Sequence, residues 1–129
     1  MEVDLDGGSA LVLADDVDVE PETEPWVALL PALDPTVMGW TERQWYLGDH
    51  RSALFDRNGN AGPTIWSDGR VVGGWAQRKD GEIVVRLLED VGAEVEAQVA
   101  ESAASLQQLY GDVRAIPRFR TPLERELTA

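Results

Sequence analysis

The chain has 129 residues, 43% of them hydrophobic, which predicts one globular domain with a real core. No apolar run reaches the length of a membrane span, and the acidic start MEVDLDGG lacks the basic and apolar regions of a signal peptide, so we expect a cytoplasmic protein. The absence of cysteine excludes disulfides, thiolate zinc sites and cysteine nucleophiles.

The net charge of −13 is unevenly distributed along the chain. Residues 1–25 contain nine of the 24 acidic residues and none of the 11 basic ones. We therefore predict an acidic N-terminal hairpin, arm and linker over residues 1–25 and a β-rich domain over residues 26–129. The acidic side chains at Asp15, Asp16, Asp18 and Glu20 lack the loop signature of a metal site, so the arm is interpreted as a solvated segment.

The first predicted elements are short. Alternating apolar residues on both sides of Gly7-Gly8 predict a hairpin. The segment WVALLPALDP predicts an edge or bent strand, because Pro31 interrupts it. Thr41 followed by Gln44 matches a capping box and predicts the start of a short helix.

The clearest pattern lies between Pro63 and Glu89, where Asp68-Gly69 and Asp80-Gly81 each predict a two-residue hairpin loop. We expect a three-stranded meander with one apolar face. The opposite, mixed face carries Trp66 and Trp75, and we expect something to cover part of it. Counting outward from the loops gives the expected strand pairs Ile65–Val72, Trp75–Arg86 and Lys79–Glu82.

The hydrophobic period becomes helical from Val91 to Tyr110, which predicts a long amphipathic helix with Asp90 as its N-cap and Gly111 beyond its end. The segment VRAIPRFR then predicts a last short strand. TPLEREL predicts a terminal helix with Thr121 as its cap. The expected fold class is α+β, an antiparallel, barrel-like sheet with a central three-stranded meander and one long amphipathic helix.

No pattern in the sequence predicts catalysis, a metal or a cofactor. His50 is the only histidine, and the preceding Asp49 forms no ready dyad with it, because adjacent side chains in an extended chain point apart. The only lysine, Lys79, lies in a predicted turn and not in a phosphate-binding loop.

The stretch LFDRNGNAGPT invites comparison with a calcium loop. Asp56, Asn58 and Asn60 match the first three ligand positions. The required glycine is replaced by Ala61 and the bidentate glutamate by Ser67, so the calcium interpretation is rejected.

Hydrogen-bond donors for nucleic acid are concentrated around the same stretch, and three arginines alternate in the expected last strand. The alternative is that these arginines pair with the many acidic residues. The candidate nucleic-acid-binding residues are His50, Arg51, Arg57, Asn58, Asn60 and Arg118.

The string LLPALDPTVMGWTERQWYLGDHRSALFDRNGNAGPTIWSDGRVVGGWAQRKDGEIVVRLLEDVG, which starts at Leu29, and the later PRFRTPLEREL resemble a bacterial family of winged-helix DNA-binding-domain proteins. This family includes the crosslink-repair DNA glycosylases of the AlkZ/YcaQ type, and the actinobacterial branch is especially similar. The resemblance covers roughly residues 2–127 and implies the family's β-rich, barrel-like C-terminal domain, which follows tandem winged helices.

The resemblance implies two catalytic glutamines separated by one residue, in an N-terminal part of the family's proteins that we expect to lie outside this chain. None of the chain's five glutamines forms that pattern, so no catalytic role transfers. We expect either part of a longer or split protein or a complete short product, without activity of its own.

Three functions remain open at this point. The first is a non-catalytic accessory domain that contacts the DNA backbone, weakly when alone. The second is a structural or interaction module that packs on winged-helix domains of the same or a split protein, or self-associates, through an exposed apolar face around Trp66 and Trp75. A stand-alone enzyme that uses His50 or Asp56 is the third and least supported.

Overall fold

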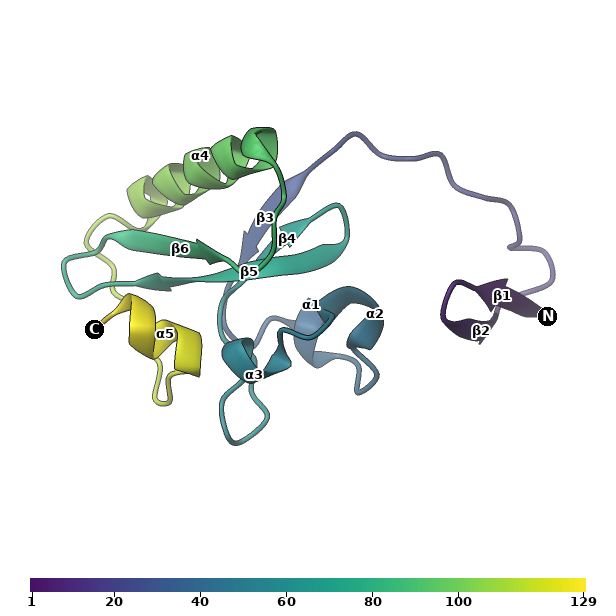
Figure 1. Cartoon of the computed structure of the whole chain (residues 1–129), viewed down its shortest axis with the longest axis horizontal. Coiled ribbons are helices and arrows are strands. Elements are labelled where there is room, and N and C mark those ends of the chain that lie inside the picture. Colours follow the sequence, from purple (N-terminus) through teal and green to yellow (C-terminus); the bar gives the residue numbers. More distant parts are fainter.

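The computed structural model describes all 129 residues, and Figure 1 shows a body joined by an extended segment to a small N-terminal hairpin. The hairpin pairs β1 (Glu2–Leu5) with β2 (Gly8–Leu11) in antiparallel register, as predicted from the glycine pair. No helix or strand occurs between this hairpin and residue 27.

The body is built on a four-stranded antiparallel sheet with the order β3-β4-β5-β6. The predicted meander is confirmed as the last three strands, and the segment before Pro31 adds an edge strand. The prediction of a barrel is wrong, because the two outer strands do not pair with each other and VRAIPRFR forms no strand that might close the sheet. The strands are β3 (Val27–Leu30), β4 (Thr64–Ser67), β5 (Arg70–Gln77) and β6 (Ile83–Leu87).

The first hairpin loop of the meander is confirmed. Asp68 and Gly69 both have positive φ, 49° and 85°, which suits a two-residue loop between twisted strands. A register shift between Ile65 and Trp66 then moves Ile65 opposite Gly73 instead of Val72.

The second hairpin departs from the predicted register by one residue. Arg78 donates its main-chain N–H to the carbonyl of Glu82, so three residues form the loop, and Gly81 takes the left-handed conformation with φ of 94°. Three-residue loops of this kind are common in hairpins. Trp75 consequently faces Val85 instead of Arg86.

Helices cover both faces of the sheet (Figure 1). On one side lies the long helix α4 (Ala93–Tyr110), whose predicted apolar stripe packs on the sheet through Val99 and Ala103. Four short helices lie on the other side. They are α1 (Pro35–Met38), α2 (Gln44–Leu47), α3 (Arg51–Leu54) and α5 (Pro122–Leu127).

This arrangement corrects the expectation of an exposed tryptophan face. Trp66 and Trp75 are only 5% and 4% exposed, and they belong to the two different core clusters on opposite sides of the sheet. The chain's own helices therefore cover the surface on which an outside partner was expected to pack. The most exposed tryptophans are Trp40 and Trp45 instead.

The predicted helix caps have mixed outcomes. Thr121 and Glu124 form the complete capping box that was predicted. Helix α2 begins after Arg43 without a side-chain cap, so the capping box at Thr41 is wrong. The N-cap of α4 is Gly92 and not Asp90. The carboxylate of Asp90 instead accepts a hydrogen bond from the main-chain N–H of Gly92. None of the helices combines the length and apolar character needed to cross a bilayer.

Candidate nucleic-acid interface

A polar groove of about 710 Å³ lies between α3 with its following loop and the N-terminal end of α5. Four guanidinium groups and two carboxylates line it, which gives a local formal charge of about +2 in a chain whose net charge is −13. We call it the arginine groove, and its charged residues are Asp49, Arg51, Asp56, Arg57, Arg120 and Arg125.

The two sides of the arginine groove, α3 with its loop and the start of α5, are more than sixty residues apart in sequence. They come together where both helices pack on Gly74 of β5. Leu54 of α3 and Leu123 of α5 both pack on this glycine, and a Cβ atom there would lie 2.7 Å from the Cδ2 atom of each leucine. Leu54 is 1% exposed and Leu123 is 4% exposed. The missing side chain at Gly74 thus lets α3 and α5 approach each other closely.

Asp56 fixes the loop that follows α3. Its Oδ1 atom accepts the main-chain N–H groups of Asn58 and Asn60 at 2.8 and 3.0 Å, and its Oδ2 atom accepts the Asn60 side-chain amide at 3.3 Å. These hydrogen bonds, the main-chain N–H of Asn60 first, lower the pKa of Asp56. The alternating Asp-Asn-Asn pattern of the sequence is therefore a self-bonded turn.

Most basic residues outside the arginine groove are already engaged. Three arginines form ion pairs with glutamates, and two others donate to main-chain carbonyls. The remaining basic side chains make no hydrogen bond or ion pair with the protein. Four of these line the arginine groove, and the other two are Lys79 and Arg118.

Phe55 positions one of the free arginines. The guanidinium carbon of Arg51 lies 4.6 Å from the centre of the Phe55 ring, and that of Arg43 lies 5.0 Å from it. Stacking of this kind orients a guanidinium group without using its N–H donors. Arg51 is therefore held at the groove with all of its donors available.

The structure separates the predicted binding residues into groups. Arg51 and Arg57 line the arginine groove, whereas Asn60 and Arg118 line a neighbouring cavity that shares Asp56 with it. Asn58 is exposed and donates its main-chain N–H to Asp56.

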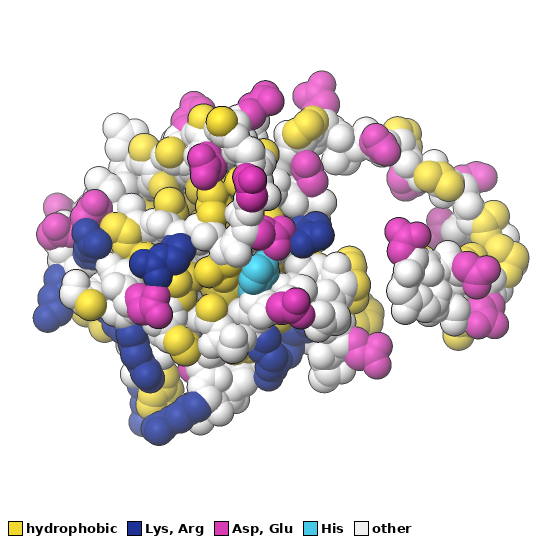
Figure 2. Space-filling model, in the orientation of Figure 1, with side chains coloured by type: hydrophobic (Ala, Val, Ile, Leu, Met, Phe, Trp, Pro, Cys, Tyr) yellow, Lys and Arg dark blue, Asp and Glu magenta, His cyan; other side chains and the backbone are white.

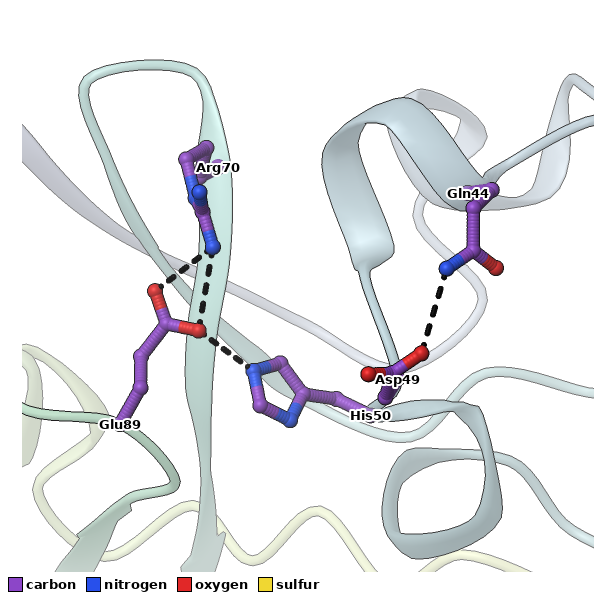
Figure 3. Close-up of polar contacts among 5 residues, drawn as sticks. All are labelled: Gln44, Asp49, His50, Arg70 and Glu89. Atoms are coloured by element: carbon purple, nitrogen blue, oxygen red, sulfur yellow. Dashed lines mark hydrogen bonds and ion pairs between the residues drawn. The ribbon is translucent and has the colours of Figure 1, made fainter. Parts of the chain in front are cut away.

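His50 lies outside both cavities. Its Nε2 atom is 2.8 Å from Glu89 Oε2, and Arg70 binds the same carboxylate, as Figure 3 shows. The adjacent Asp49 accepts a hydrogen bond from the Gln44 side chain at 3.3 Å and lines the groove.

Arg120 and Arg125 were not among the final candidate binding residues, although Arg120 was one of the three alternating arginines that were considered for phosphate contact. Arg120 was expected in a strand together with Arg114, but no strand forms, and Arg114 donates to the carbonyls of Lys79 and Asp80. No spacing in the sequence connects residues 120–125 with α3, because only the packing at Gly74 brings them together.

The surface charge follows the same division. Figure 2 shows acidic side chains over the N-terminal hairpin, the linker and α4, while basic side chains gather around and below the sheet. The positive surface is thus local, on the side of the body opposite to α4.

Two comparisons with known proteins find a relationship. The sequence profile of the family described as DNA glycosylase AlkZ-like matches residues 1–109. The solved structure of the Streptomyces sahachiroi DNA glycosylase AlkZ is similar with a TM-score of 0.59 and 32% sequence identity. The similarity covers 81% of this chain and 31% of that glycosylase. No curated protein matches the chain. The chain belongs to the family of AlkZ-like DNA glycosylases.

Proposed function

We propose that the chain is a non-catalytic accessory domain of an AlkZ-like DNA-repair protein and that its arginine groove contacts the DNA backbone. One observation supports the contact most directly. Of the five arginines that make no hydrogen bond or ion pair with the protein, four line a single groove, although acidic residues outnumber basic ones by 13. In so acidic a chain, arginines left unpaired and gathered together favour a negatively charged ligand.

The geometry of the groove suits phosphodiester oxygens. Guanidinium groups bind phosphate through paired N–H donors, and here these donors come from both sides of an open groove. Asp49 and Asp56 offset part of the positive charge. We expect contact with about two to four phosphates, so the logarithm of the DNA affinity falls with the logarithm of salt concentration with a slope of about −2 to −4.

The non-catalytic part of the proposal rests on the chemistry of the same groove. It contains no histidine or lysine, and the lowered pKa of Asp56 makes that carboxylate a poor general base near neutral pH. No two glutamines in the chain are separated by one residue.

Titration of labelled duplex DNA at about 20 to 200 mM salt, followed by fluorescence anisotropy, tests the proposal. Arg51→Gln with Arg57→Gln removes two charges from exposed positions of the groove. We expect this pair to weaken binding about tenfold or more at low salt and to reduce the salt slope by about 2.

The matched control is Arg70→Gln with Arg78→Gln, which removes the same charge at two arginines that are ion-paired outside the groove. The control pair should change the affinity about twofold or less. Equal losses in both pairs, or no binding by the wild-type chain at low salt, would contradict the proposed contact.

The alternative function is a structural or interaction module that packs on winged-helix domains outside this chain. Trp40 and Trp45 favour it, because their exposed fractions of 67% and 75% are unusual for tryptophan. Trp40→Ser with Trp45→Ser should abolish binding to separately expressed winged-helix domains of a homologue and leave the DNA affinity unchanged. If the domains still bind, these tryptophans are not the docking surface.

A further inference from the structure

A second cavity, of about 330 Å³, adjoins the arginine groove and shares Asp56 with it. Its walls combine apolar and hydrogen-bonding groups, whereas most residues that line the arginine groove are charged. We call it the Phe119 cavity, after the one aromatic residue that lines it, and the residues that matter here are Leu33, Asn60, Arg118, Phe119 and Glu124.

Glu124 brings an unused acceptor to this cavity. The residue is only 4% exposed, and its Oε2 atom accepts the main-chain N–H of Thr121 at 2.8 Å. Its other oxygen, Oε1, forms no hydrogen bond within the protein, and no arginine or lysine forms an ion pair with the carboxylate. No buried side-chain nitrogen or oxygen of the protein lacks a hydrogen-bond partner, so Oε1 is open to the cavity and can accept a hydrogen bond from a ligand there.

Asn60 adds a second acceptor of the same kind. Its amide nitrogen donates to Asp56 Oδ2, and its amide oxygen makes no hydrogen bond. The carboxylates of Asp56 and Glu124 both border the cavity, so a phosphate group would be repelled there. The polar part of the cavity is thus suited to an uncharged group with N–H donors.

The apolar part offers a surface for stacking. Phe119 is 43% exposed, and the guanidinium carbon of Arg118 lies 5.4 Å from the centre of its ring. Aromatic rings and arginine planes are the surfaces on which proteins stack unpaired bases. A carboxylate beside them is the usual acceptor for the amino group of cytosine.

We propose that the Phe119 cavity takes an unpaired nucleobase with an exocyclic amino group, on a strand whose phosphates follow the arginine groove. The inference rests on the proposed function, because the shared Asp56 joins the base cavity to the groove that would hold the phosphates. Beyond the proposed function, we infer that the chain binds unpaired DNA more tightly than intact duplex. We also infer that it binds bases with an amino group more tightly than thymine.

The experiment compares oligodeoxycytidine with oligothymidine of equal length, at low salt, on the full chain. Cytosine presents an amino group to Glu124, whereas the only N–H of thymine lies between two carbonyls that a carboxylate repels. We expect wild type to bind the cytidine strand about 3- to 10-fold more tightly.

The key variant is Glu124→Gln, because glutamine keeps the capping box with Thr121 and replaces the free oxygen with an NH₂ group. We expect it to abolish or invert the preference for cytidine. Phe119→Ala should weaken both single strands and leave duplex binding unchanged, while Leu109→Ala, a mutation at a position 81% exposed on α4, should change nothing.

The outcomes separate this inference from the proposed function. If the groove pair Arg51→Gln with Arg57→Gln weakens DNA binding but wild type and Glu124→Gln show the same base preference, the base cavity is overturned and the groove contact stands. If no DNA binds at low salt, both are overturned. Loss of the cytidine preference in Glu124→Gln alone supports the inference.

Discussion

His50 Nε2 lies 2.8 Å from Glu89 Oε2, and Arg70 Nη2 reaches the same carboxylate at 2.9 and 3.1 Å (Figure 3). The three residues tie the turn before α3 to the start of β5 and to the chain that leaves β6. This contact holds the N-terminal end of α3, where Arg51 begins one side of the arginine groove. His50 is thus placed to support the groove without lining it.

His50→Ala should therefore reduce stability more than DNA binding. Glu89 keeps Arg70 as its partner in the variant, so no charge is left buried and unpaired. We expect the free energy of unfolding in urea to fall by about 1 kcal/mol and the DNA affinity to stay within about twofold. A large loss of DNA affinity in a stably folded His50→Ala protein would instead support the prediction that His50 contacts DNA.

Asp49→Asn, a change at the residue next to His50, should affect DNA binding more than stability. Asp49 lines the arginine groove, and asparagine can still accept the hydrogen bond from Gln44. Loss of one negative charge from the groove should strengthen DNA binding about 2- to 5-fold at low salt and less at high salt. The control is Glu101→Gln on α4, across the sheet, which removes the same charge and should raise the affinity less.

Protonation of Asp56 should lower the stability of the protein in acid. Its pKa is lowered in the folded state, so the carboxylate binds a proton less readily there than in the unfolded chain. Its stabilising contribution is present above the usual pKa of about 4 and is lost as the pH falls through the lower, folded value. The free energy of unfolding, measured in urea at about pH 7 and pH 3, should fall more for wild type than for Asp56→Asn. Equal losses would mean that the hydrogen bonds to Asp56 add nothing to folding.

Local signals in the sequence predicted much of the fold. The glycine pair of the N-terminal hairpin, the Asp68-Gly69 loop, the stripe of α4 and the capping box at Thr121 each act within a few residues, and each is confirmed. The errors arose where local rules allow alternatives. A hairpin loop with a glycine can hold two residues or three, and helices of four residues, such as α1 and α3, have no period to read.

The site was harder to predict than the fold, for a physical reason. Arg51 and Arg57 belong to one donor-rich stretch and were found from composition. Arg120 and Arg125 join them only because two leucines from distant helices pack on one glycine, which no pattern within a short window shows. The resemblance to a DNA-repair family gave the context that the residues alone did not, and the family match confirms it.

Gly74 should consequently affect both folding and DNA binding. A methyl group at Gly74 would lie 2.7 Å from Leu54 Cδ2 and from Leu123 Cδ2, so these two buried side chains must shift and the packing between α3 and α5 is disturbed. We expect Gly74→Ala to lower the free energy of unfolding by about 1 to 3 kcal/mol and to weaken DNA binding in the protein that remains folded. Urea unfolding and anisotropy titration measure the two effects.

Two further glycine variants and one double variant make the test of Gly74 specific. Gly73→Ala should cost more stability, because its methyl group would overlap the main-chain carbonyl of Arg86, which cannot give way as a leucine side chain can. Gly7→Ala, in the open N-terminal hairpin, should change neither quantity. Adding Leu123→Val to Gly74→Ala removes a methylene group at the point of overlap, and the double variant should recover part of the lost stability and DNA affinity. Strictly additive losses would show that α3 and α5 are not held together at this glycine.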